Sequence, residues 1–360
     1  MNIPHFGLTR QYQNLKEETL DITDKVLTSG ILVNGEYTNK FEEWLKHRTK
    51  ARYAIITHSG TQALYTIAKY KYDIEFKYRI NSKKSPTVIL PNLTYPATLN
   101  AFALAGWNIV IEDTDKYGVL DKITISYNEF PYICLVGLYG KKPWPNGLIY
   151  EEHQYYGIID GAQHWLNVRG DFGSAMAISF DPTKNLSANG NGGAIVTDDD
   201  DLNIYARDFI NNGKNGIFNR VGTNSKMSEL DCAHLMVKTR YINAWQKRRH
   251  EIARYYNERF KELPITLLAD DLTDHALQKY VIYSSDRSEL CRHMKDEGID
   301  VKIHYNYTLS ELGSAQLYKK PDMLSTSTML SRGVLSLPIY PELTDIEVEY
   351  IVNMINKFYT

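Results

Sequence analysis

Lys184 is the residue of this chain with the clearest chemical potential, because of what stands on either side of it. It lies in the run Ser179-Phe-Asp-Pro-Thr-Lys-Asn185, between an apolar segment at Ala175–Phe180 and a glycine-rich segment at Gly190–Gly193. A lysine between a buried strand and a tight turn can hold an aldehyde cofactor as a Schiff base. Partial desolvation or neighbouring cations must then keep part of its amine unprotonated near neutral pH. Most lysines are solvated surface charges, so the hypothesis depends on the residues placed beside this one.

A phosphate-binding turn is predicted at Ser59, Gly60 and Thr61, which follow the apolar segment Tyr53–Thr57 and open a helical segment. Backbone N–H groups at a helix N-terminus, together with small hydroxyls, are the usual protein ligands of phosphate. Ser179, at the start of the lysine run, could add another hydroxyl. Taken alone, the turn is better explained as an ordinary strand-to-helix connection with a serine cap.

Three further side chains suit a pyridine ring. Asp160 ends the apolar segment Gly157–Ile159, at the edge where the carboxyl ends of parallel strands meet ligands. A carboxylate there could keep a ring nitrogen protonated, so that the ring acts as an electron sink. Gln163 could reach a phenolic oxygen of the ring, and Tyr95, which follows the segment Thr87–Leu90, could cover its face. Asp160 as a helix cap and Tyr95 as a packing residue remain open alternatives.

The elements that must position these residues alternate between strand and helix from about residue 50 to residue 200. Short apolar runs suit strands that are covered on both faces of a mostly parallel α/β sheet. Helices are predicted at Thr61–Tyr70, at Ala97–Leu104, and near the N-terminus from Leu15 to a stop at Gly30. The predicted strands are Tyr53–Thr57, Thr87–Leu90, Ile109–Ile111, Tyr132–Val136, Gly157–Ile159, Ala175–Phe180 and Ala194–Thr197.

The pattern changes after Ser228, and two domains are expected: a large one with an N-terminal arm at residues 1–235, and a small α+β domain with a long linking helix at residues 236–360. That linking helix is predicted to run unbroken from Ser228 toward Leu263. The acidic run Asp198–Asp201 is expected to be a solvated turn, and residues 70–85 a surface loop or helix end. The small domain is predicted to contain a strand at Lys279–Ser284, a helix at Ser288–Glu297, strands at Val301–His304 and Leu335–Pro338, and a capped helix at Thr344–Phe358.

Composition narrows the function classes. The 360 residues carry a formal net charge of −2 and no strongly basic segment, which argues against a nucleic-acid-binding protein. The N-terminus is polar and charged, unlike a signal peptide, and no apolar stretch approaches the ~20 residues of a membrane span. Three scattered cysteines, Cys134, Cys232 and Cys291, form no CxxC pair. We therefore expect reduced thiols in a cytoplasmic protein, with no membrane, nucleic-acid or metal partner.

These features occur together in one order, and that ordered set resembles the DegT/StrS group of sugar aminotransferases, which are fold-type I pyridoxal phosphate enzymes. The resemblance covers nearly the whole chain. It implies a large domain with a mostly parallel seven-stranded sheet between helices. The motifs that carry it are Ile3-Pro-His-Phe6, Leu27-Thr-Ser-Gly30, Ser59-Gly-Thr-Gln-Ala-Leu64, Leu93-Thr-Tyr-Pro-Ala-Thr98, Asp160-Gly-Ala-Gln163, Ser179-Phe-Asp-Pro-Thr-Lys-Asn-Leu186, Gly222-Thr-Asn-Ser-Lys-Met-Ser-Glu229, Leu335-Ser-Leu-Pro338 and Leu343-Thr-Asp345.

The resemblance assigns a role to each site residue. Lys184 would anchor pyridoxal 5'-phosphate and shuttle a proton, and Asn224 would reach the phosphate in the neighbouring subunit of a homodimer with shared active sites. The roles implied for the other residues are phosphate binding by Ser59, Gly60, Thr61 and Ser179, ring stacking by Tyr95, contact with the ring nitrogen by Asp160, and contact with the phenolic oxygen by Gln163. Some relatives that dehydrate sugars carry histidine at the lysine position, so Lys184 favours transamination.

The implied reaction moves an amino group from L-glutamate to a nucleotide-linked 3- or 4-keto-6-deoxyhexose, in two half-reactions with ping-pong kinetics. This chain departs from the family pattern at Asn224-Ser225-Lys226, where many members have Asn-Tyr-Arg, and at Tyr305–Ser310, which lacks a usual proline and histidine. Gly137 stands where a histidine is often seen. Two alternatives follow: an aminotransferase for a keto-cyclitol or another acceptor that is not a sugar nucleotide, and a non-catalytic regulatory homologue.

Overall fold

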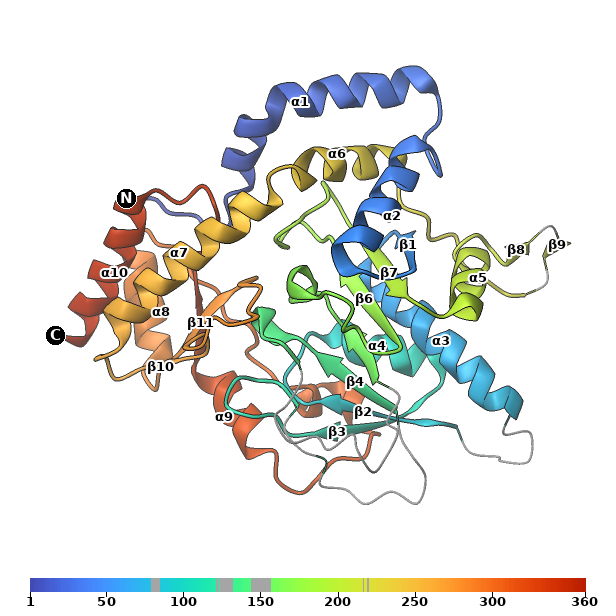
Figure 1. The fold of residues 1–360 in the computed structure, drawn as a ribbon. Coiled ribbons are helices and arrows are strands. Elements are labelled where there is room, and N and C mark those ends of the chain that lie inside the picture. The colour runs from blue at the N-terminus through green and yellow to red at the C-terminus, as the bar shows by residue number, and fades with distance from the viewer. Residues whose placement is uncertain (79–84, 121–122, 124–131, 144–156, 216, 219) are drawn as a thin grey trace.

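The computed structural model describes residues 1–360 except 79–84, 121–122, 124–131, 144–156, 216 and 219 (Figure 1). Among the described residues, seven strands form one sheet in the order β1-β7-β6-β5-β4-β2-β3. Every pairing among β2 to β6 is parallel, and β7 runs antiparallel to both of its neighbours. The strands are β1 (Tyr53–Thr57), β2 (Thr87–Pro91), β3 (Asn108–Glu112), β4 (Tyr132–Val136), β5 (Gly157–Asp160), β6 (Ala175–Ser179) and β7 (Gly193–Thr197). The seven predicted strands are confirmed, with ends that shift by at most one residue.

The strands have near-continuous apolar sequences because both faces of the sheet are covered. Val88 and Leu90 of β2 belong to one buried cluster, whereas Ile89 between them belongs to another. Helices α3 (Gly60–Tyr78), α4 (Pro96–Ala105) and α5 (Asp200–Phe209) supply the first cluster, and α2 (Glu36–Thr49) and α6 (Glu229–Thr239) contribute to the second. Successive side chains of a strand point to opposite faces, so two apolar layers need an unbroken apolar run.

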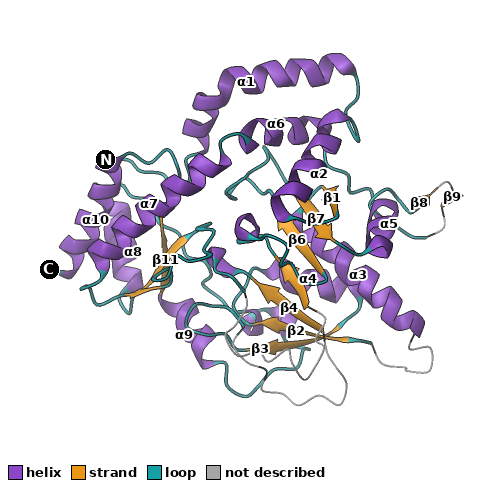
Figure 2. Ribbon diagram, in the orientation of Figure 1, coloured by secondary structure: helices purple, strands orange, loops and turns teal. Residues whose placement is uncertain are grey.

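A second, antiparallel sheet of three described strands lies in the C-terminal part of the chain (Figure 2). Its strands are β10 (Thr266–Leu267), β11 (Tyr280–Tyr283) and β12 (Val334–Leu337), and the helices that accompany it are α7 (Ile242–Phe260), α8 (Arg287–Asp296), α9 (Ser325–Gly333) and α10 (Asp345–Tyr359). Thr344 caps α10 in a capping box with Glu347, as the sequence predicts. The expected domain boundary at residue 235 falls within α6 and stays a prediction.

Three local predictions are wrong. The expected single helix after Ser228 is two helices, α6 and α7, because α6 packs on α1 (Leu8–Ser29) and α2 while α7 packs on α10. The expected strand Val301–His304 contributes one isolated bridge, Lys302 to Ser336, before the chain turns away from the sheet. The acidic run Asp198–Asp201 opens helix α5, because the Asp199 carboxylate accepts the backbone N–H of Leu202 at 2.9 Å.

The ends of two helices and several short elements complete the described structure. Helix α1 ends at Gly30 in a left-handed conformation, with φ of 69°, as its glycine predicts. Helix α3 continues to Tyr78, so the first part of residues 70–85 is a helix end, one of the two predicted alternatives, and residues 79–84 lie outside the described part. The others are the strands β8 (Lys214–Asn215) and β9 (Ile217–Phe218) and the 3-10 helices Leu138–Gly140, Trp165–Asn167, Leu309–Glu311 and Gly313–Ala315.

Candidate active site

A pocket of about 360 Å³ lies where strands β5 and β6 of the large sheet end. The carboxyl edge of parallel strands is the usual ligand site of such sheets. The C-terminal part of the chain contributes Lys279, His304 and Tyr305 to its lining. The predicted site residues that line it are Ser59, Gly60, Thr61, Tyr95, Asp160, Gln163, Ser179 and Lys184. The structure therefore brings together residues that span 125 positions of the sequence, from Ser59 to Lys184.

Lys184 enters the pocket from a turn that follows β6. The Asp181 carboxylate accepts the backbone N–H of Thr183 at 2.9 Å, and the Asp181 carbonyl accepts the N–H of Lys184 at 2.8 Å. Within the described part of the chain, no hydrogen bond or ion pair is recorded for the Lys184 amine. Burial lowers the pKa of Lys184, and the carboxylates of Asp181 and Asp160 oppose this shift. The pocket thus offers an amine of reduced basicity, which a covalent anchor requires.

The turn before α3 forms a close backbone cradle. A Cβ added to Gly60 would lie 2.7 Å from the Cβ of Ser179, and one added to Gly193 would lie 2.3 Å from the carbonyl carbon of Ser59. The first amides of a helix have no intrahelical acceptor, so those of α3 can bind an anion. Ser59 also caps α3, with its hydroxyl accepting the N–H of Gln62 at 3.1 Å. The capping alternative and the phosphate hypothesis are therefore compatible.

Asp160 lies at the end of β5 without a cation within ion-pair distance among the described residues. Its carboxylate accepts the Thr98 hydroxyl at 2.8 Å and the backbone N–H of Ala162 at 3.1 Å. Burial is the largest influence on the pKa of Asp160 and raises it, because a charged carboxylate is costly to remove from water. A protonated pyridine nitrogen is a cationic hydrogen-bond donor and would offset that cost.

Gln163 is held in one orientation by its neighbours. Its Oε1 accepts the backbone N–H of Tyr139 at 2.7 Å, so its Nε2 is left as the donor and lies 3.2 Å from the hydroxyl of Tyr305. A donor is what a phenolate oxygen needs. Tyr95 precedes α4 with 57% of its surface exposed, and its ring centroid lies 5.8 Å from that of Tyr305. Both arrangements fit the contacts expected around a pyridoxal ring.

Sequence reasoning missed several residues of this pocket. The sequence predicts no site role for Tyr305, which stands in a departure from the family pattern, or for Thr98, which ends the motif Leu93–Thr98. Nothing in the local sequence distinguishes Lys279 or His304 from ordinary surface or core residues. Their presence depends on how the C-terminal part of the chain packs against the large sheet and its helices, which no spacing rule encodes.

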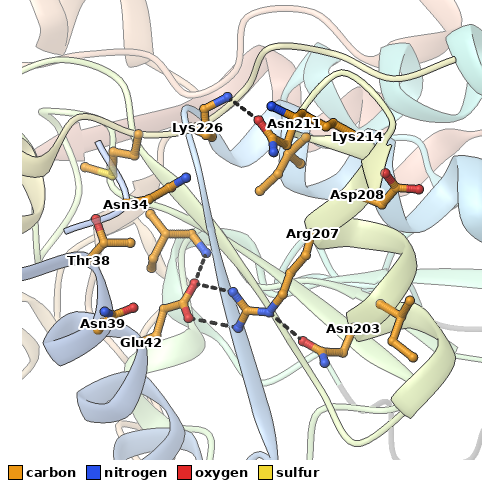
Figure 3. Close-up of a pocket in the computed structure, with 14 residues that line it drawn as sticks. Asn34, Thr38, Asn39, Glu42, Asn203, Arg207, Asp208, Asn211, Lys214 and Lys226 are labelled. Atoms are coloured by element: carbon orange, nitrogen blue, oxygen red, sulfur yellow. Dashed lines mark hydrogen bonds and ion pairs between the residues drawn. The ribbon is translucent and has the colours of Figure 1, made fainter. Parts of the chain in front are cut away.

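Asn224 does not lie in this pocket. It is exposed, and its side-chain oxygen accepts from the Lys226 ammonium at 3.0 Å. Lys226 lines a separate cavity of about 450 Å³ beside α2 and α5 (Figure 3). In that cavity the Arg207 guanidinium pairs with the Glu42 carboxylate at 2.8 Å. Neither Lys226 nor Asn224 thus lines the lysine pocket of its own chain.

Together, the mostly parallel sheet, the helix cradle and the amine of reduced basicity define a pyridoxal-phosphate-dependent transferase of the α/β class. The model of the DegT/DnrJ/EryC1/StrS aminotransferase family matches residues 13–128 and 153–356. The chain belongs to this family of pyridoxal-phosphate-dependent sugar aminotransferases, and it is an aminotransferase.

Three similar proteins illustrate the range of the family. A pleiotropic regulatory protein of Geobacillus stearothermophilus is 29% identical, with 100% of this chain and 99% of the relative covered. The dTDP-3-amino-3,4,6-trideoxy-alpha-D-glucose transaminase of Streptomyces venezuelae is 28% identical, with 99% of this chain and 96% of the relative covered. A crystal structure of a DegT DnrJ EryC1 StrS aminotransferase from Brucella abortus superposes with a TM-score of 0.87 at 26% identity, covering 100% of this chain and 99% of that one.

Among the described residues, no helix has the length and apolar character needed to cross a bilayer.

Proposed function

We propose that the protein transfers an amino group from L-glutamate to a nucleotide-linked 3- or 4-keto-6-deoxyhexose, as a step in amino-sugar and polysaccharide biosynthesis. The observation that carries the proposal is the half-buried Lys184, which shares one pocket with the Asp160 carboxylate and whose amine has no hydrogen bond or ion pair among the described residues. Relatives named as transaminases of dTDP-linked and UDP-linked sugars support the acceptor class.

Lys184 would hold the cofactor and move the proton. Pyridoxal phosphate, when bound, supplies an electrophilic carbon that carries the amino group and a ring that accepts electron density. The same amine serves as anchor and then as general base and acid, which requires it to be unprotonated at the working pH. Desolvation in the pocket favours that condition, because it lowers the pKa of Lys184.

The other residues would bind and orient. Asp160 would hold the proton of the ring nitrogen, and the Nε2 group of Gln163 would donate to the phenolic oxygen. Tyr95 would cover one face of the ring. The amides of Gly60 and Thr61 and the hydroxyls of Ser59 and Ser179 would bind the phosphate. Each of these roles uses a donor or acceptor that the pocket already presents.

We propose further that two copies share their active sites, with Asn224 of each reaching the phosphate bound by the other. The exposed position of Asn224 supports this assignment, as it is free to meet a second molecule. The segment before α2 also exposes apolar side chains: Ile31 by 55%, Leu32 by 52% and Val33 by 48%. A contiguous exposed apolar segment is typical of an interaction surface. We place the protein in the cytoplasm on account of its three free, buried cysteines.

The acceptor is tested by separating the two half-reactions. Enzyme loaded with pyridoxal phosphate is first converted with L-glutamate and freed of 2-oxoglutarate. It is then offered 3-keto and 4-keto nucleotide sugars, and the return of its visible absorbance is followed, because only a true acceptor removes the amino group. The proposal predicts return with a keto-6-deoxyhexose nucleotide; return with none of them would contradict it.

Two alternatives give different results in the same assay. The altered stretch Tyr305–Ser310 favours a keto-cyclitol reading, because Tyr305 lines the pocket and contacts Gln163. Return of the absorbance with keto-cyclitols alone would establish that reading. A regulatory protein would show no conversion by glutamate at all, even with the cofactor bound to Lys184.

A further inference from the structure

Lys279 is a second buried lysine in the same pocket, and nothing in the reaction described above uses it. It precedes β11, has 4% of its surface exposed, and lines the pocket with Lys184, His304 and Tyr305. Lysine is rarely buried unless it is paired, because removing an ammonium from water is costly. A reason for its burial must therefore be found in what surrounds it.

The backbone around Lys279 is fixed to the large domain. Its N–H donates to the carbonyl of Tyr139 at 3.0 Å, and the side-chain amide of Gln278 donates to the carbonyl of Thr183 at 2.8 Å. Thr183 is the residue before Lys184. These contacts hold the second lysine against the turn that carries the first one, at the joint between the two domains.

The ammonium of Lys279 lacks a counter-charge. Its recorded side-chain hydrogen bond goes to the neutral Oε1 of Gln278, at 2.6 Å, and no carboxylate of the described residues lies within ion-pair distance. Burial lowers the pKa of Lys279 most, Lys184 and Arg249 lower it further, and Asp181 opposes them. A bound anion would favour the ammonium form, which has three N–H groups and so can donate beyond its bond to Gln278.

We propose that Lys279 forms the subsite that binds a carboxylate of the amino donor. The inference rests on the proposed function, in which a dicarboxylic amino acid and its keto acid occupy this pocket in turn. A carboxylate would supply the missing counter-charge and accept the N–H groups that Gln278 does not use. The cofactor phosphate is served elsewhere, by the cradle before α3, whereas Lys279 lies on the side of the pocket formed by the small domain.

We expect an anion in this subsite to bind the Lys279 side chain and not the imidazole of His304. Burial and the nearby Lys279 lower the pKa of His304, so its ring is neutral at physiological pH. Its Nδ1 is engaged with the Ser336 hydroxyl at 2.8 Å. Because Lys184 would be linked to the cofactor, Lys279 is the cation of the described lining that can gain a partner, and its replacement should remove most of the anion affinity.

The test uses glutarate, a dicarboxylate with the carbon skeleton of the donor that cannot undergo transfer. Its binding to the cofactor-loaded dimer is measured by isothermal titration calorimetry, for wild type and for Lys279→Met, which keeps the length of the side chain without its charge. We expect the Kd to rise by about thirtyfold or more in Lys279→Met, because a buried charge pair loses one partner. Lys302→Met is the matched control, since Lys302 lies in the same domain, is half exposed, and pairs with Asp300 at 2.9 Å. It should bind glutarate as wild type does.

Two further measurements complete the test. Lys279→Arg keeps the cation and should retain part of the affinity, whereas a purely structural role would be disturbed most by this larger group. Glucuronate, a uronate without the donor skeleton, is titrated in parallel. An unchanged glutarate Kd in Lys279→Met would overturn the proposal. A loss of glucuronate binding alone would also overturn it, because Lys279 would then bind the acceptor and not the amino donor. If wild type converts with glutamate while Lys279→Met binds glutarate normally, this inference fails and the proposed function stands.

Discussion

At the scale of single residues, Gly137 and His164 occupy one tightly filled space next to two pocket residues, Val136 and Gln163. Gly137 follows β4, and the ring of the buried His164 lies directly over it. A Cβ on Gly137 would lie 2.0 Å from Nδ1 and 2.3 Å from Cγ of that ring. The histidine often seen at position 137 is thus excluded by one at position 164, next to Gln163.

The first prediction concerns this pair. Gly137→Ala should lower the free energy of unfolding by about 1–3 kcal/mol, because the added methyl overpacks a filled space. Combining it with His164→Ala, which removes the obstructing ring, should recover part of that loss, giving a favourable coupling energy in a double-mutant cycle. Denaturant unfolding of the wild type, both single variants and the double variant measures it. Strictly additive effects would show that the two residues do not compete for space.

The second prediction is a pH dependence that arises from Lys279. Burial and the neighbouring Lys184 lower the pKa of Lys279 well below 10.5, and the groups around it are Asp181, Arg249 and the imidazoles of His304 and His5. At pH values between the folded-state pKa of Lys279 and 10.5, the Lys279 amine is protonated in the unfolded chain but not in the folded protein. Lys279 therefore lowers the free energy of unfolding at neutral pH, and it lowers this free energy less as the pH rises.

Lys279→Met should accordingly be more stable than wild type at pH 7 in the absence of ligands. Its advantage should shrink towards pH 10.5, by at most about 1.4 kcal/mol per pH unit. Urea unfolding of both proteins between pH 7 and 10 measures the difference. A difference that stays constant over this range would mean that Lys279 is as basic in the folded protein as in the unfolded chain.

At the scale of elements, a buried carboxylate fixes the start of α2. Glu229, the first residue of α6, accepts the backbone N–H groups of Gly35 at 2.9 Å and Thr38 at 3.2 Å, and the Thr38 hydroxyl at 2.6 Å. Its own N–H donates to the carbonyl of Leu32 at 2.8 Å. One side chain therefore joins two helices and positions the exposed apolar segment at residues 31–33.

The third prediction follows from this contact. Glu229→Ala should destabilise the protein by about 1–3 kcal/mol, because it leaves buried donors without an acceptor. Glu229→Gln, which keeps one acceptor oxygen and nearly the same shape, should cost less. Thermal unfolding of the two variants compares them; equal losses would show that packing, and not hydrogen bonding, governs this junction.

The elements also show what a sequence can reveal. The seven strands were predictable because each is a short apolar run between polar turns, and the cap of α10 because Thr344 and Glu347 form a recognisable box. The break between α6 and α7 was not, since it arises from packing on different neighbours. In the pocket, the lining residues that belong to a local motif could be proposed from the sequence, whereas Lys279 and His304 come from the C-terminal part of the chain and reach the pocket only through the tertiary fold.

At the scale of the whole molecule, the proposed function predicts a dimer in which each active site uses residues of both chains. The fourth prediction tests this by complementation. Lys184→Ala and Asn224→Ala homodimers should each be inactive or nearly so. After unfolding and refolding an equal mixture, random pairing should restore about a quarter of wild-type activity, because half of the dimers are mixed and each has one intact site. No recovery in a mixture shown to contain mixed dimers would place Asn224 in the site of its own chain or outside any site.

The most direct test of the central claim is the behaviour of Lys184. Wild-type protein mixed with pyridoxal phosphate should develop the visible absorbance of a lysine-linked cofactor, and addition of L-glutamate should abolish that absorbance. Lys184→Ala should lack the band and lose glutamate turnover, while its circular dichroism and thermal unfolding stay close to those of wild type. A folded Lys184→Ala protein that still converts glutamate would contradict the account.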